Sequence, residues 1–171
     1  APIILIGPMG SGKSSVGRKL ATALSRVFYD CDKEIELATG VSITTIFDLE
    51  GEVGFRRREQ LALRELCAHP NIVLATGGGV VLDPENRALM KDQGLLIYLK
   101  TSLPALLRRT HKDTTRPLLQ TTDPAGKMAE ILSLREPLYE QLADYAIDTS
   151  FVSVTEVVER IVAYLAHLSE K

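Results

Sequence analysis

The sequence has little cysteine and little histidine, with two residues of the first type and three of the second among 171. Cys31 and Cys67 do not form a CxxC pair, which favours reduced, partly buried thiols over a disulfide framework. The histidines are far apart along the chain, so no cluster with the spacing of zinc ligands is present. The sequence therefore predicts neither a disulfide-rich protein nor a zinc protein.

A surplus of charge is also absent, since 20 Lys and Arg residues face 22 Asp and Glu residues. A net charge of −2 argues against nucleic-acid binding as the main task. The longest apolar run in the second half, residues 95–99, is far shorter than the roughly 20 residues that span a bilayer. No positively charged segment followed by an apolar one opens the sequence. We therefore expect a cytoplasmic protein that binds neither nucleic acid nor a membrane.

The composition is that of a globular protein, with 45% hydrophobic and 25% charged residues. A chain of this length is expected to form a single domain over residues 1–171. Short apolar runs alternate with amphipathic stretches, and this alternation predicts βαβ units. The runs are 2–6, 27–29, 72–75, 95–99 and 145–147. We predict an α/β fold of three layers, with a parallel sheet covered by helices on both faces.

The stretches between the runs carry helix signals. Val16, Leu20 and Leu24 recur at every fourth residue of a helix predicted over 13–25. A longer helix is predicted over 52–67. Three further helices are expected to begin after residues that can accept a hydrogen bond at the N-cap, namely Asp83, Asp123 and Ser153.

One segment, residues 110–123, does not fit this alternation. It is polar and rich in threonine, and it contains a lone Arg116 followed by a proline and two leucines. Loops of about this length within compact domains are usually functional or disordered. We predict a mobile lid over this segment.

Residues 7–14, Gly-Pro-Met-Gly-Ser-Gly-Lys-Ser, match the phosphate-loop pattern GxxxxGK[ST] between an apolar run and a helix. The glycines let backbone N–H groups converge on a phosphate, and the helix N-terminus adds partial positive charge. Lys13 can reach the β- and γ-phosphates, and the Ser14 hydroxyl can ligate Mg²⁺. We therefore predict a nucleoside triphosphate site. Its predicted residues are Gly10, Ser11, Gly12, Lys13, Ser14 and Ser15.

Acidic residues and glycines follow two other runs. Asp30 and Asp32 follow the second run, and Gly77, Gly78 and Gly79 follow the third. Ligands of parallel α/β sheets bind at the carboxyl ends of the strands, where these residues are expected to lie. The glycines permit a small ligand to lie against bare backbone. A solvated acidic pair and a tight turn are the alternatives.

Two arginines can have either a structural or a binding role. Arg56 and Glu59 share a helix face at a spacing of three residues, which is typical of a solvated ion pair. Arg135, which precedes Glu136 and Pro137, is equally ambiguous when it is considered alone.

Taken in order along the chain, these segments resemble the shikimate kinase family. The matching segments are the phosphate loop, Asp30-Cys31-Asp32 with Ile35-Glu36, Gly40, Ile46-Phe47, Gly51-Glu52, Phe55-Arg56-Arg57 with Glu59, Gly77-Gly78-Gly79, Arg116-Pro117-Leu118, Arg135 and Pro137-Leu138-Tyr139. The resemblance spans nearly the whole chain. It implies a monomeric P-loop kinase with a five-stranded parallel sheet, which uses ATP as co-substrate, Mg²⁺ as cofactor and shikimate as acceptor.

The resemblance also implies roles for individual residues on the nucleotide side. Lys13, Asp32 and Arg116 would be catalytic, with Arg116 meeting the γ-phosphoryl group as the lid closes. Mg²⁺ would be held by Ser14 and, through water, by Asp30 and Asp32. Arg109 would approach the adenine.

The implied acceptor region extends over residues 32–59 and includes later segments. By resemblance, Asp32 would accept hydrogen bonds from shikimate hydroxyls and act as the base at the 3-hydroxyl. Arg56 and Arg135 would clamp the carboxylate, because arginine offers two parallel N–H donors to two oxygens. The other implied contacts are Phe47, Phe55, Gly77, Gly78 and Gly79.

Two alternative functions remain open. The same fold could phosphorylate gluconate or a nucleoside monophosphate, although Arg56 together with Arg135 favours a carboxylate acceptor. The chain could also be a non-catalytic nucleotide-binding module. The joint presence of Lys13, Ser14, Asp32 and Arg116 argues against this alternative.

Overall fold

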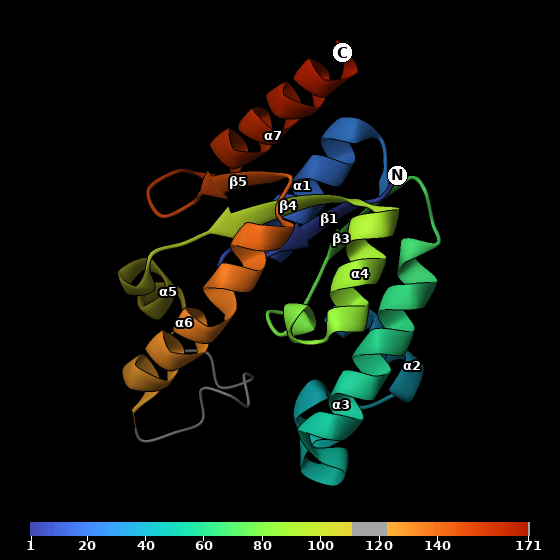
Figure 1. The fold of residues 1–171 in the computed structure, drawn as a ribbon, viewed down its shortest axis with the longest axis vertical. Helices are drawn as coiled ribbons and strands as arrows, with labels where there is room; N and C mark the ends of the chain where they lie inside the picture. The colour runs from blue at the N-terminus through green and yellow to red at the C-terminus, as the bar shows by residue number, and fades with distance from the viewer. Residues whose placement is uncertain (111–122, 171) are drawn as a thin grey trace.

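The structure is a computed structural model that describes residues 1–110 and 123–170. It contains one sheet of parallel strands. The strands are β1 (Ile3–Ile6), β2 (Val27–Asp30), β3 (Ile72–Ala75), β4 (Leu95–Lys100) and β5 (Tyr145–Asp148). Their order in the five-stranded sheet is β2-β3-β1-β4-β5 (Figure 1). Each predicted apolar run matches one strand to within one residue, so the predicted α/β fold with a parallel sheet is confirmed.

Successive side chains of a strand point to opposite faces of the sheet. Because both faces of these strands are mainly apolar, helices pack on both of them. Ile3 and Leu5 pack against α1 (Lys13–Leu24) and α7 (Val154–Ser169). Ile4 and Ile6 pack on the other face, which a second set of helices covers (Figure 1). These helices are α2 (Cys31–Thr39), α3 (Ile43–Cys67), the 3₁₀ helix η1 (Val80–Leu82), α4 (Pro84–Gln93) and α6 (Pro124–Leu142). The two cores fix the sheet edge from which the functional loops emerge.

The predicted N-caps are all present. The Asp83 carboxylate accepts a hydrogen bond from the Glu85 N–H at 2.8 Å, and Asp123 accepts one from the Gly126 N–H at 3.0 Å. The Ser153 hydroxyl accepts one from the backbone of the third residue of α7 at 3.1 Å. These bonds satisfy N–H groups that have no partner within the helix.

The helix predicted over 52–67 is longer in the structure, because α3 already begins at Ile43. Ser42 caps its start and accepts a hydrogen bond from the Thr45 N–H at 3.1 Å. Gly51 has φ 73° and ψ −176°, so two helical segments meet there at a kink. The kink brings the rings of Phe47 and Phe55, one on each segment, to a centroid distance of 4.9 Å.

Both cysteines are buried and free, as predicted. Among the helices of the described residues, none is both long and apolar enough to cross a membrane. Thr110 closes α5 (Leu103–Thr110) and Asp123 caps α6, so the two ends of the predicted lid segment are helical boundaries. Residues 111–122, which include Arg116, lie outside the described residues.

Candidate active site

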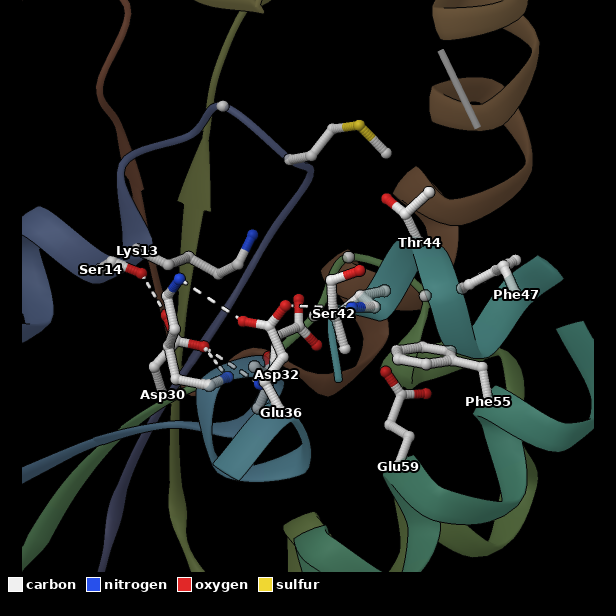
Figure 2. A pocket seen from close by; sticks show the side chains of 18 of the residues that line it. Lys13, Ser14, Asp30, Asp32, Glu36, Ser42, Thr44, Phe47, Phe55 and Glu59 are labelled. Carbon is white, nitrogen blue, oxygen red and sulfur yellow. Dashed lines mark hydrogen bonds and ion pairs between the residues drawn. The ribbon is translucent and has the colours of Figure 1, made fainter. Parts of the chain in front are cut away.

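A cavity of about 650 Å³ lies at the carboxyl edge of the sheet (Figure 2). The segments that follow β1, β2 and β3 line it, together with residues of α3 and α6. Parallel strands place these carboxyl-terminal segments side by side. The predicted residues that line the cavity are Gly10, Gly12, Lys13, Ser14, Ser15, Asp30, Asp32, Phe47, Phe55, Arg56, Gly77, Gly78, Gly79 and Arg135. Segments that are far apart in the sequence therefore share one cavity.

The phosphate loop joins β1 to α1 along one side of this cavity. Gly12 is the N-cap of α1 with φ 93°, a left-handed conformation that favours glycine. Ser11 is buried within the loop. The Lys13 ammonium donates to the carbonyl oxygens of Gly7 at 2.6 Å and Pro8 at 2.8 Å. The loop thus holds a cation beside the N-terminus of α1, which is an arrangement suited to polyphosphate.

Asp30 connects the phosphate loop to the second strand. It ends β2 and caps α2, where its Oδ1 accepts a hydrogen bond from the Asp32 N–H at 3.0 Å. Its Oδ2 accepts a hydrogen bond from the Ser14 hydroxyl at 2.5 Å. A hydroxyl and a carboxylate in contact are hard oxygen donors of the kind that Mg²⁺ prefers. The pair at this position therefore fits a magnesium ion.

Arg109, the residue predicted to lie near adenine, packs beside the phosphate loop. Its guanidinium donates to the Gly10 carbonyl at 3.1 Å and to the Thr149 carbonyl at 2.8 Å. It thereby ties the end of α5 to the phosphate loop and to the segment after β5. A planar guanidinium held in this way can stack on a nucleobase.

The three glycines after β3 form the floor of the other end of the cavity. A Cβ atom on Gly77 would lie 3.0 Å from Oε2 of Glu59 and 3.1 Å from Oδ1 of Asp32. A Cβ atom on Gly79 would collide with the guanidinium of Arg56. The backbone of these glycines therefore lies in close contact with the polar side chains of Asp32, Arg56 and Glu59.

Arg56 and Glu59 form an ion pair, but not the solvated pair that the sequence allowed. Glu59 is fully buried, and its Oε1 accepts a hydrogen bond from Nη1 of Arg56 at 2.9 Å. Burial raises the pKa of Glu59 to about 7, against the opposing effect of the Arg56 charge. Within the described part of the chain, Oε2 of Glu59 and Nε of Arg56 have no hydrogen-bond partner. Buried polar atoms of this kind are suited to a polar ligand.

Arg135 and Tyr139 lie one helical turn apart on α6 and are both buried. Burial lowers the pKa of the Arg135 guanidinium. The Tyr139 hydroxyl donates to the Gly78 carbonyl at 2.5 Å. Burial raises the pKa of Tyr139 to about 12, and the interaction with Arg135 opposes this effect. The second predicted clamp arginine is therefore fixed against the glycine floor.

The sequence predicted no ligand-binding role for Glu59 or Tyr139, although both stand in the matching segments. A signal for Glu59 exists, because Phe55, Glu59 and Leu63 recur at every fourth residue and are all buried. A carboxylate in such an apolar stripe indicates a buried partner. Tyr139 follows Arg135 by four residues, which places both on one helix face.

A phosphate loop, a magnesium-type oxygen pair and a polar acceptor pocket on a parallel sheet define a P-loop phosphotransferase that acts on a small molecule. The family model described as "Shikimate kinase" matches residues 9–166. The chain belongs to the shikimate kinase family.

Individual relatives agree with this assignment. The shikimate kinase of Thioalkalivibrio sulfidiphilus is 56% identical over 162 residues, which cover 95% of this chain and 85% of the relative. That of Legionella pneumophila (strain Corby) is 53% identical over 163 residues, covering 95% and 93%. The solved structure of shikimate kinase from Acinetobacter baumannii in complex with shikimate has a TM-score of 0.95 at 45% identity, and the match covers 99% of this chain and 94% of that one.

Proposed function

We propose that this protein transfers the γ-phosphoryl group of ATP to the 3-hydroxyl of shikimate, which gives shikimate 3-phosphate and ADP. The observation that carries the proposal is the acceptor end of the cavity. There, Arg56 and Arg135 converge on the glycine floor beside Asp32. The complex of the A. baumannii relative with shikimate supports the same acceptor.

The acceptor end recognises an anion with neighbouring hydroxyl groups. Two guanidinium groups offer parallel N–H donors to a planar carboxylate, and Nε of Arg56 is buried and available for this purpose. Asp32 and Glu59 flank Gly77 and present carboxylate oxygens to hydroxyl groups. Phe47 and Phe55 line the same cavity and offer an apolar surface to the ring. Shikimate has a carboxylate, neighbouring hydroxyl groups and a ring, and so matches all three parts of this pocket.

The nucleotide end places the triphosphate on the phosphate loop. Backbone N–H groups at the start of α1 and the Lys13 ammonium would bind the β- and γ-phosphates. Ser14 would ligate Mg²⁺ directly, and Asp30 and Asp32 would hold it through water. When bound, the ion would neutralise charge on the phosphate oxygens. Arg109, beside the loop, would contact the adenine.

Transfer then depends mainly on position and charge. The phosphoryl group passes through a loose transition state whose negative charge is spread over its oxygens, so the Lys13 ammonium stabilises it. Asp32 accepts the proton of the attacking hydroxyl, since its carboxylate lines the cavity between the phosphate loop and the acceptor floor (Figure 2). Arg116 is proposed as a second cation and lies outside the described residues.

A coupled assay of ADP release tests the proposal. Purified protein with Mg-ATP should turn over rapidly with shikimate and slowly with gluconate or AMP. Phosphorus NMR of the product should place the phosphate on the 3-hydroxyl. Turnover with AMP comparable to that with shikimate would instead identify a nucleoside monophosphate kinase.

A further inference from the structure

Tyr139 joins α6 to the glycine floor of the acceptor site. Its hydroxyl donates to the Gly78 carbonyl at 2.5 Å, and its ring packs on Tyr98 of β4 with 5.1 Å between centroids. Neither tyrosine is appreciably exposed. A buried tyrosine needs a partner for its hydroxyl, and here that partner belongs to the floor of the acceptor site.

The same hydroxyl also faces the proposed carboxylate clamp. Arg135 precedes Tyr139 by one helical turn and interacts with it through a hydrogen bond and its positive charge. The Arg135 guanidinium lies over the floor, since a Cβ atom on Gly78 would be 3.3 Å from its Nη1. Arg135, the Tyr139 hydroxyl and the half-buried Gly78 carbonyl therefore form one group that joins α6 to the segment after β3.

We infer that Tyr139 is a positioning residue that holds Arg135 and the Gly78–Gly79 backbone in register for the acceptor carboxylate. The inference rests on the proposed function. Tyr139 touches no reacting atom, so its contribution belongs to acceptor binding rather than to phosphoryl transfer. Without the hydroxyl, the half-buried Gly78 carbonyl and the buried Arg135 guanidinium each lose a partner, and the clamp is free to shift.

The test compares Tyr139→Phe with Tyr98→Phe. Both changes remove one hydroxyl from the same buried aromatic pair, but only the first removes a hydrogen bond to the acceptor floor. Tyr139→Phe should raise the KM for shikimate about tenfold, while kcat and the KM for ATP stay within about twofold. Tyr98→Phe should leave all three parameters within about twofold of the wild-type values.

A double-mutant cycle separates positioning from a general loss of structure. In an Arg135→Lys background, which already lacks the guanidinium fork, Tyr139→Phe should add less than about twofold to the KM for shikimate. Tyrosine labelled with ¹³C at the ζ carbon provides a measurement on the wild-type protein that is independent of any variant. The Tyr139 resonance should shift when shikimate binds and stay in place with shikimate methyl ester.

Four results would each overturn the inference. Two concern the single variants: an unchanged KM for shikimate in Tyr139→Phe, or equal effects of Tyr139→Phe and Tyr98→Phe. The other two are additive effects of Tyr139→Phe and Arg135→Lys, and a Tyr139 resonance that does not shift when shikimate binds. These results are distinguishable from a failure of the proposed function. If the wild-type protein released no ADP with shikimate, the proposed function would fall, and the inference would fall with it.

Discussion

The two ends of the cavity are built in different ways. The nucleotide end is a contiguous segment, residues 7–15, and its proposed phosphate-binding groups are the backbone N–H groups at the start of α1 and the Lys13 ammonium. The acceptor end is assembled from separate parts of the chain: Asp32 after β2, Arg56 and Glu59 on α3, the glycines after β3, and Arg135 on α6. The first depends on local sequence, whereas the second depends on how four elements pack.

This difference predicts which changes affect each end. Substitutions in the phosphate loop should impair transfer and leave the acceptor end intact. Changes that move α3 or α6 should weaken acceptor binding before they affect the nucleotide.

Lys13→Ala should have the largest effect. Cations that stabilise a transferring phosphoryl group contribute roughly 10³–10⁵-fold to the rate. Lys13 places its ammonium group against the phosphate loop. Steady-state assays should show a fall of this order in kcat/KM for ATP. Lys19→Ala is the matched control on α1, because Lys19 is exposed and donates to Thr155. A fall smaller than about tenfold in Lys13→Ala would contradict the assignment.

Asp32→Asn should lower kcat by roughly 10²–10⁴-fold, since an amide cannot accept the proton of the attacking hydroxyl. ATP affinity, measured by calorimetry, should stay near the wild-type value. Asp30→Asn should behave differently, because Asp30 contacts Ser14 in the proposed Mg²⁺ site, and excess Mg²⁺ should restore part of its activity. Nearly full kcat for Asp32→Asn at saturating shikimate would exclude Asp32 as the base.

Glu59→Gln tests the buried carboxyl through the pH dependence of stability. The folded-state pKa of about 7 lies above the ordinary value of 4.5, chiefly because of burial. Glu59 therefore stabilises the fold most fully below pH 4.5, and this contribution is lost as the pH rises through 7. Across this window the wild-type protein should lose on the order of 3 kcal/mol relative to Glu59→Gln. Urea unfolding of both proteins at pH 5 and pH 8 measures the difference, and parallel pH dependences would refute it.

Arg56→Lys should have the smallest effect of the four. Lysine keeps the charge but loses the bidentate geometry, so the KM for shikimate should rise about tenfold with little change in the KM for ATP. Arg57→Lys, at an exposed position of the same helix, is the control. Equal KM values for the two variants would show that Arg56 does not contact the carboxylate.

The same contrast between local and packed elements explains which features of the structure could be predicted from the sequence. The strands and the phosphate loop were predictable because each is encoded in consecutive residues. The kink at Gly51 was not, because nothing adjacent to it signals that a helix resumes on the other side. The buried state of Glu59 and the bond from Tyr139 to Gly78 were also missed, since both arise only when α3, α6 and the β3 loop pack together.

The central claim is that one cavity joins a self-contained phosphate loop to an acceptor pocket built by packing. Calorimetric titration of shikimate into wild-type protein, Lys13→Ala and Arg135→Lys tests it most directly. The account predicts that Lys13→Ala binds shikimate within about threefold of the wild-type affinity, while Arg135→Lys binds about tenfold more weakly. Wild-type affinity in Arg135→Lys, or loss of shikimate binding in Lys13→Ala, would contradict it.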